Sequence, residues 1–319
     1  MTPKLAFLMD PLETINIKKD STHAMMQAAE TRGWEVSCLT QADIYTTDGK
    51  VWLDHSRVKL SSGKDKWYEI VNQETHPAEY FNAIFLRKDP PFNMEYIYTT
   101  YLLELAEQQG VPVLNRPGSV RDCNEKLFAL QFPQVCPPHL VSRSPDKLHD
   151  FYEAQKDVIF KPLDGMGGAS IFHAGPGEHN LSVIIETLTD KGQQQVMAQR
   201  YIPEITAGDT RILLIDGEAL PYGLARIPKA GETRGNLAAG ATPTGRELND
   251  RDRFICDQIA PQLRQRGLYF VGIDVIGDYL TEINVTCPTG IKELDAAFNV
   301  NIASDYMDFV EGMFGKANA

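Results

Sequence analysis

The side chains with the clearest chemical pattern lie in the segment GIDVIGDYLTEINVTCPT (272–289). Asp274 stands inside an apolar, strand-like run, and Glu282 and Asn284 share one face of the next run because side chains alternate along a strand. Carboxylate and amide oxygens are the ligands that Mg²⁺ prefers. Two carboxylates brought together in an apolar setting without a cation would repel each other, and one would be protonated. These residue types therefore indicate an oxygen-only metal site.

The turn between the two strands decides whether the carboxylates meet. A three-residue turn at 277–279 places Asp274 opposite Glu282, whereas a two-residue turn places them on opposite faces. We expect the three-residue turn, with Asp274, Glu282 and Asn284 facing one cleft. The alternative is a set of surface polar residues on a half-exposed sheet, which the apolar neighbours disfavour.

A glycine-rich stretch lies upstream, in VIFKPLDGMGGASIF (158–172). Its glycines, Gly165, Gly167 and Gly168, leave backbone amides open to a ligand, and Lys161 precedes them. The spacing fits neither the Walker loop nor the dinucleotide fingerprint, and apolar residues follow, so we expect the glycines to join two strands. Such a hairpin can fold over a triphosphate as a flap. A plain hairpin turn is the alternative.

The flap, the lysine and the metal site together indicate Mg-ATP, because Mg²⁺ bridges phosphates while lysines hold the rest. Between them lies IPKAGETRGNLAAGATPTG (227–245), which is rich in glycine, contains Lys229 and Arg234, and follows Arg226. Long segments without core-forming residues are most often lids or disordered linkers. We interpret 227–245 as a cationic lid over an anionic substrate, with a solvated linker as the alternative.

The elements that must position these groups follow from hydrophobic periodicity. In the first third of the chain, strand-like runs alternate with helical segments, which predicts a parallel α/β layer. Strands are expected at 5–9, 34–39, 83–87 and 111–114, and helices between 20 and 33 and at 94–109.

An α+β region is expected next. Ser119 and Asp122 have the spacing of a capping box, which predicts a helix through Leu130, and the prolines within 133–138 end it. Further elements are expected as follows: a strand at 139–142, a helix opened by Ser144, a hairpin over 211–226 turning at Asp216-Gly217, a helix at 249–266 containing Pro261, and strands at 268–276 and 280–286.

Composition narrows the class of protein. The 319 residues suffice for about two domains or three compact subdomains. A net charge of −12 argues against a nucleic-acid partner. The first residues contain too short an apolar run for a signal peptide, and no later run approaches membrane-spanning length, so we expect a cytoplasmic protein with no membrane partner. The five scattered cysteines form no CxxC pair, which is typical of reduced thiols.

Several long motifs resemble the bacterial glutathione synthetase family of ATP-grasp ligases. They are KPLDGMGGASIF (161–172), ARIPKAGETRGNLAAG (225–240), VGIDVIGDYLTEINVTCPT (271–289), MDPLETINIKKDST (9–22), RKDPPFNMEYIYTTYLLE (87–104) and RDCNEKLFA (121–129). The resemblance implies an α/β fold, with an N-terminal parallel α/β (pre-ATP-grasp) domain before a two-part α+β ATP-grasp domain. The implied limits are 1–122 for the substrate-binding domain, 123–202 for the subdomain with the flap, and 203–319 for the subdomain with the metal site and the lid.

The resemblance also assigns roles to individual residues, carried over position by position. The implied ATP-binding residues are Lys126, Lys161, Asp164, Gly165, Met166, Gly167, Gly168, Gln199, Tyr201, Ile202 and Asp209. The implied metal ligands are Asp274, Glu282 and Asn284, and the implied catalytic arginines are Arg211, Arg226 and Arg234.

In the implied reaction, ATP phosphorylates the cysteinyl carboxylate of γ-glutamylcysteine, and glycine then attacks the acyl phosphate. The implied metal is Mg²⁺ or Mn²⁺, and the implied assembly is a homotetramer. Another ATP-grasp ligase with a different small amino-acid or peptide substrate would share the ATP machinery. A non-enzymatic ATP sensor would not need Arg211, Arg226 and a cationic lid.

The chain departs from the family pattern in three places. Ala241 and Thr242 stand where a second glycine and an arginine are expected at the end of the lid. Arg200 stands where a smaller polar residue is usual, and Cys287 replaces a serine-like residue. We interpret Cys287 as a packed side chain. None of these positions is a phosphate, metal or oxyanion group, so we expect them to affect kinetics rather than the reaction.

Overall fold

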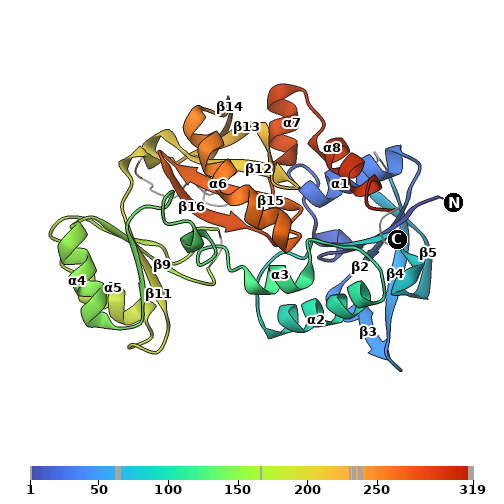
Figure 1. The fold of residues 1–319 in the computed structure, drawn as a ribbon, viewed down its shortest axis with the longest axis horizontal. Coiled ribbons are helices and arrows are strands. Elements are labelled where there is room, and N and C mark those ends of the chain that lie inside the picture. Colours follow the sequence, from blue (N-terminus) through green and yellow to red (C-terminus); the bar gives the residue numbers. More distant parts are fainter. Residues whose placement is uncertain are drawn as a thin grey trace.

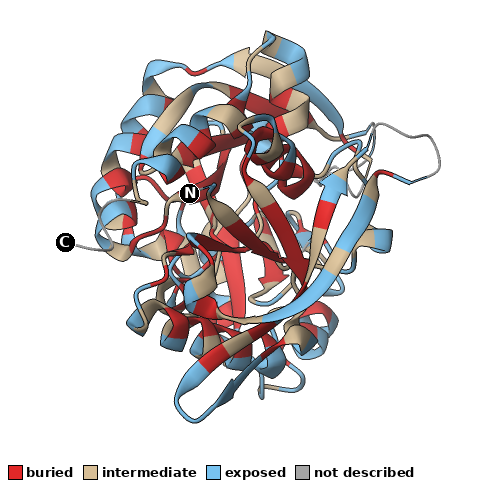
Figure 2. Ribbon diagram, turned by 90° about the vertical axis from the view of Figure 1, so that its right-hand side faces the viewer, coloured by how far each residue is buried: buried red, intermediate tan, exposed pale blue. Residues whose placement is uncertain are grey.

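The structure, a computed structural model, describes residues 2–61, 66–165, 167–229, 231, 235 and 240–314. Within these ranges the strands form a seven-stranded, a four-stranded and a five-stranded sheet, in that order along the chain (Figure 1). Buried residues gather along the strands at the centre of the molecule (Figure 2). This arrangement confirms the predicted α/β layer followed by a two-part α+β region. None of the helices in the described ranges has both the length and the apolar character needed to cross a membrane.

The first sheet is parallel at its centre and antiparallel at one side. The order β2-β1-β6-β7 is parallel, which confirms the predicted α/β layer. The antiparallel strands β3, β4 and β5 were not predicted. For β5 the reason is that most of its residues are exposed, so its sequence lacks the alternation of apolar and polar residues that marks a half-buried strand. The strands are β1 (Lys4–Leu8), β2 (Glu35–Leu39), β3 (Ile44–Thr47), β4 (Lys50–Leu60), β5 (Tyr68–Pro77), β6 (Ala83–Leu86) and β7 (Val113–Leu114).

Side-chain caps stand at the start of two helices of this domain, which lie at the predicted places. Asp20 accepts a hydrogen bond from the backbone N–H of His23 at the start of α1 (Ser21–Thr31). Asn93 accepts one from the backbone N–H of Tyr96, 3.0 Å away, at the start of α2 (Met94–Gln108). These caps satisfy backbone donors that the first helical turn leaves unpaired.

The predicted helix through Leu130 is wrong. The helix at this place, α3 (Pro117–Asp122), begins one turn earlier, and Ser119 does not cap it but donates to the carbonyl of Arg266. The Asn124 side chain accepts hydrogen bonds from the backbone N–H groups of Lys126 and Leu127, at 3.1 and 3.0 Å. An asparagine that binds nearby backbone donors competes with helix formation, which explains the interruption.

The second sheet has the order β10-β9-β11-β8 and is antiparallel. Its buried side chains form a core of their own with those of two helices, so this part is a separate lobe. The glycine-rich stretch joins β9 to β10, which confirms the predicted hairpin. The elements are β8 (His139–Ser142), α4 (Pro145–Gln155), β9 (Val158–Pro162), β10 (Phe172–Ala174), α5 (Leu181–Leu188) and β11 (Val196–Arg200).

The third sheet, of order β14-β13-β12-β15-β16, shares its core with the first sheet. The hairpin β12–β13 turns at Asp216-Gly217, as predicted, and both residues have positive φ. The last two helices pack with α1 (Figure 1). The predicted domain limits at 122 and 202 stay a prediction. The elements are β12 (Asp209–Ile215), β13 (Glu218–Ile227), β14 (Thr242–Glu247), α6 (Asp250–Arg266), β15 (Phe270–Ile276), β16 (Tyr279–Asn284), α7 (Ile291–Phe298) and α8 (Ile302–Glu311).

Candidate active site

The residues expected to bind a metal lie on β15 and β16. Asp274 pairs directly with Glu282, as expected. The predicted three-residue turn is wrong, because Ile276 pairs with Tyr279 and leaves a two-residue turn at 277–278. A β-bulge next to Asp274 places one extra residue in β16 and so restores the pairing of the carboxylates.

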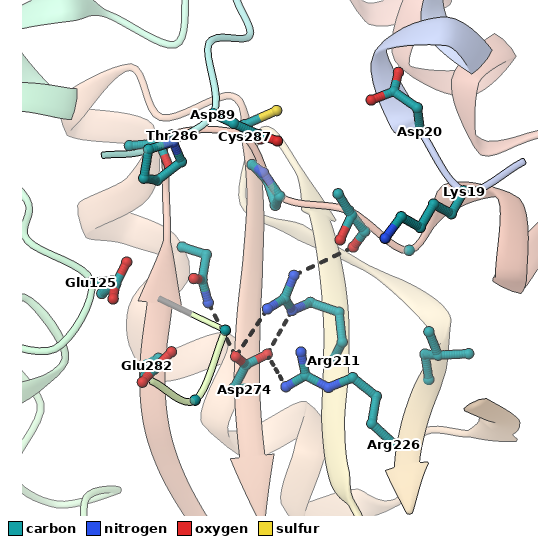
Figure 3. A pocket seen from close by; sticks show the side chains of 18 of the residues that line it. Lys19, Asp20, Asp89, Glu125, Arg211, Arg226, Asp274, Glu282, Thr286 and Cys287 are labelled. Carbon is teal, nitrogen blue, oxygen red and sulfur yellow. Dashed lines mark hydrogen bonds and ion pairs between the residues drawn. The ribbon is translucent and has the colours of Figure 1, made fainter. Parts of the chain in front are cut away.

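Asp274 is the centre of a buried charge network, which Figure 3 shows. Arg211 donates to its two carboxylate oxygens from Nε and Nη2, at 2.6 and 3.0 Å, and Nη2 of Arg226 lies 3.0 Å from Oδ1. Burial alone would raise the pKa of Asp274, but the two guanidinium groups hold it well below its usual range. Asp274 is therefore a fixed anion that orients both arginines.

Asp209 shares Arg226 with Asp274. Nη2 of Arg226 lies 2.5 Å from Oδ2 of Asp209. Burial raises the pKa of Asp209 to about 7, against the lowering effect of Arg226. The other carboxylate oxygen of Asp209 is buried and has no hydrogen-bond partner among the described residues. An acceptor of this kind is open to a ligand hydroxyl.

Two buried lysines approach Glu282 from different elements. Nζ of Lys126 and Nζ of Lys161 each lie 3.8 Å from Oε1 of Glu282. Lys126 also donates to the carbonyl of Gly165 in the glycine stretch, at 2.8 Å. Burial lowers the pKa of Lys161, whereas for Lys126 the effect of burial is outweighed by Glu282 and Glu125, which raise its pKa. The two amino groups therefore lie together beside the carboxylate of Glu282.

Glu125 is a site residue that the sequence analysis missed. It forms an ion pair with Lys126, and burial together with the charge of Glu282 raises its pKa. The motif RDCNEKLFA contained it, but no local pattern marks one glutamate next to a lysine as functional.

Two adjoining cavities contain most of the expected groups, and Glu282 and Ile171 line both. The first, of about 640 Å³, is lined by the expected residues Lys126, Gly165, Gly167, Gly168, Arg211, Arg226, Asp274, Glu282 and Asn284. The second is lined by the expected residues Lys161, Gln199, Tyr201, Ile202 and Asp209.

The other expected site residues are Asp164, Met166 and Arg234. Asp164 lines neither cavity. Met166 and Arg234 lie outside the described residues, as does most of the expected lid at 227–245. The lid therefore stays a prediction.

The first cavity also has an acidic end that the sequence analysis did not predict. It is built from loops and helix ends of the first and last parts of the chain, and Figure 3 shows some of its side chains around the arginines. The motifs at 9–22 and 87–104 supplied several of these residues without indicating a role. The charged residues at this end are Asp10, Lys19, Asp20, Asp89 and Glu293.

A glycine flap over two lysines, next to paired carboxylates on an antiparallel sheet, defines an ATP-grasp ligase. Solved structures share the fold. An ATP-grasp ligase, PsnB, in complex with a minimal precursor, Mg and ADP, has a TM-score of 0.63 at 17% identity and 98% coverage of both chains. The D-cycloserine synthetase DcsG has a TM-score of 0.67 at 14% identity, covering 98% of this chain and 99% of that one.

The sequence places the chain in one family of this class. The N-terminal domain of prokaryotic glutathione synthetase matches residues 4–121, and its ATP-grasp domain matches residues 125–299. Glutathione synthetase of Pseudomonas syringae pv. tomato is 56% identical over 98% of both chains, and that of Vibrio vulnificus is 50% identical over the same share. The chain belongs to the prokaryotic glutathione synthetase family, an ATP-dependent carboxylate–amine ligase family, which confirms the predicted resemblance and class of enzyme.

Proposed function

We propose that this chain joins γ-glutamylcysteine to glycine, with consumption of ATP, in the two adjoining cavities. The observation that carries the proposal is the shared wall at Glu282, with two lysines beside it and two arginines bound to Asp274, its partner on the neighbouring strand. A nucleotide in one cavity and a substrate carboxylate in the other would meet at this wall. Transfer of a phosphoryl group depends on such positioning more than on any covalent step by the protein.

The second cavity suits the nucleoside of ATP. Its apolar walls include Ile159 and Ile205, and Gln199 and Tyr201 offer polar edges for the base. The unpartnered oxygen of Asp209 would accept a ribose hydroxyl. Lys126 and Lys161 would then hold the phosphates, and the β9–β10 hairpin would cover them.

The side-chain oxygens of Asp274, Glu282 and Asn284 on β15 and β16 fit Mg²⁺ or Mn²⁺. The Nδ2 group of Asn284 donates to Asp274 at 3.2 Å, which leaves its amide oxygen on the other side of the amide group, where it would bind a cation together with the Glu282 carboxylate. Asp274 would share its oxygens between the cation and the arginines. The bound cation would neutralise phosphate charge and polarise the transferred group.

The arginines would act on the reacting carboxyl group. An oxygen of the cysteinyl carboxylate attacks the γ-phosphorus of ATP, and ADP leaves with the electrons of the broken bond. The amine of glycine then attacks the acyl carbon and displaces phosphate. Arg211 and Arg226, fixed by Asp274, would stabilise the oxyanion of the tetrahedral intermediate. Arg234 would add a third positive charge from the expected lid.

The acidic end of the first cavity supports a substrate with ammonium groups. Asp20 and Glu293 face a region that γ-glutamylcysteine would fill, and carboxylates recognise ammonium groups through charge-assisted hydrogen bonds. The ammonium group of the peptide would thus face carboxylates, and its reacting carboxylate would face Arg211 and Arg226.

The proposed assembly is a cytoplasmic homotetramer, as the family resemblance implies. One face of α2 supports an interface, because Met94, Tyr98, Tyr101 and Leu105 leave 54, 51, 50 and 38% of their surface exposed. The free cysteines fit a reducing compartment. Light scattering of the purified protein would give the mass of the assembly, and a monomer would contradict this proposal.

The test of the activity is ADP release with γ-glutamylcysteine, with glycine, with both, and with neither. We expect sustained release only with both substrates, together with formation of glutathione. Release with neither substrate, or with glycine alone, would contradict the ligase.

A further inference from the structure

Two histidines and a glutamate form a cluster on β4 and β5, outside the ligase cavities. His55 lies directly opposite Glu74 across the two strands, and His76 is two residues beyond Glu74, on the same face. One possible ligand atom from each of the three side chains lies within 4.8 Å of the others. Strand pairing therefore brings two imidazoles and a carboxylate to one point.

We propose that His55, Glu74 and His76 bind a divalent transition-metal ion such as Zn²⁺. Imidazole nitrogen suits Zn²⁺, and two histidines with one carboxylate are a common set of protein ligands, which leaves the fourth position of a tetrahedral site to water. His55 and Glu74 also line a cavity of about 450 Å³, through which an ion can enter.

The distances are close to those of a bound ion. Nε2 of His55 and Nδ1 of His76 are 3.0 Å apart and share a hydrogen bond, which a bound ion would replace. Two nitrogens bound to one tetrahedral Zn²⁺ are about 3.3 Å apart. Oε2 of Glu74 lies 4.0 Å from the same nitrogen of His76. A rotation of the glutamate side chain, which is on an exposed strand, closes this gap.

Neighbouring aromatic rings hold both imidazoles in place. The ring of His76 stacks on Tyr80 with centroids 3.7 Å apart and an angle of 5° between the planes. The ring of His55 meets Phe81 edge to face, with centroids 4.9 Å apart. Ligands fixed in this way lose little conformational entropy on binding an ion.

The surroundings of the two imidazoles favour a cation. The carboxylates of Glu74 and Asp54 supply negative charge next to the ring of His55.

A metal at this point would link the two strands of an edge hairpin. Among the described strands, β5 pairs only with β4, and most of its residues are exposed. The ion would therefore stabilise the edge of the first sheet and take no part in ligation.

The experiment measures Zn²⁺ binding to the full chain by competition with a chromogenic chelator. Excess Mg²⁺ is present to occupy the carboxylates of the ligase site. We expect one Zn²⁺ per chain, and at least tenfold weaker binding in the variants His76→Leu and Glu74→Gln. His179→Leu is the matched control, because His179 is an exposed histidine elsewhere in the chain, and it should bind Zn²⁺ like the parent.

Two further readouts complete the test. Co²⁺ in place of Zn²⁺ should give the visible absorption of a tetrahedral ion, and His76→Leu should lose it. Ligase activity of His76→Leu should equal that of the parent, which separates this proposal from the proposed function. Binding of Zn²⁺ that is unchanged in both His76→Leu and Glu74→Gln, or no binding by the parent, would overturn the proposal.

Discussion

Lys161 gives the most direct test of the nucleotide site at the scale of a single residue. It lies next to the last residue of β9, is buried, and directs its ammonium group towards Glu282. Lys161→Met keeps the aliphatic stem and removes the charge, so we expect at least tenfold weaker ATP binding, about 1.4 kcal/mol. Titration calorimetry would measure it. Lys147→Met, at an exposed lysine of the same lobe, is the control. Equal affinity for ATP in the two variants would show that Lys161 does not bind the nucleotide.

A substitution of a second single residue, Glu282, tests the metal site. Glu282→Gln keeps the size of the side chain and removes a negative charge from the expected ligand set, so we expect turnover to fall by at least a hundredfold, about 2.7 kcal/mol. Circular dichroism and thermal unfolding should show a folded protein. Glu218→Gln, at a side chain that is 84% exposed, should keep full activity. A Glu282→Gln enzyme with parental turnover over a range of Mg²⁺ concentrations would contradict the assignment.

The flap hairpin can be tested at the scale of the element. Gly168 has φ +81° and lines the first cavity. An alanine there is strained by about 1 kcal/mol, and its methyl group would face the phosphates. We expect Gly168→Ala to lower kcat/KM for ATP, whereas Gly177→Ala, with φ +77° in the turn after β10, should cost similar stability and leave kcat/KM unchanged. The same kinetic loss in both variants would show a general effect on the lobe.

The packing of α2 against α3 predicts a dependence of stability on pH. Burial raises the pKa of Glu107 to about 7, although Arg116 lies 3.9 Å away and lowers it. Between the pKa of an unfolded glutamate, about 4.3, and this value, the folded state binds more protons than the unfolded state. This carboxyl group therefore makes the free energy of unfolding fall as pH rises from about 4.3 to about 7.

Urea denaturation at pH 5 and pH 8 would measure the effect of Glu107. Glu107→Gln should lose less stability than the parent between these two pH values, since it cannot ionise. Glu218→Gln should follow the parent. Equal losses in the Glu107→Gln variant and the parent would mean that the carboxyl group titrates normally.

Tyr306 tests how the whole molecule is held together. This fully buried side chain of α8 contacts Phe85 of the first sheet and Phe270 of the third, with ring centroids 6.0 and 5.0 Å apart. Truncation of a large buried aromatic residue to alanine costs about 3 kcal/mol. We expect Tyr306→Ala to lower the free energy of unfolding by this amount. Phe254→Ala, at an exposed ring, should change it little. A comparable loss in both variants would contradict the role of α8.

The sequence by itself determined the local elements and the class of chemistry. Glycine and aspartate at the turn of β12–β13, side-chain caps before α1 and α2, and the glycine stretch between β9 and β10 act over a few residues, so they can be predicted without a fold. The motifs around Lys161 and Asp274 indicated Mg-ATP for the same reason. The predicted helix through Leu130 was wrong because the Asn124 side chain binds backbone N–H groups beyond α3 and so competes with helix formation.

Only the tertiary structure decided which distant side chains meet. The bulge that places Asp274 opposite Glu282 is set by the pairing of β15 with β16, and the capture of Arg211 and Arg226 by Asp274 depends on three neighbouring strands. The pairing of β5 with β4 brings His55 to Glu74. Because most of β5 is exposed, its sequence shows no alternation of apolar and polar residues from which the strand could be predicted. Contacts of this kind arise from pairing between strands, and the sequence of each strand does not show which bulge or which partner the pairing will have.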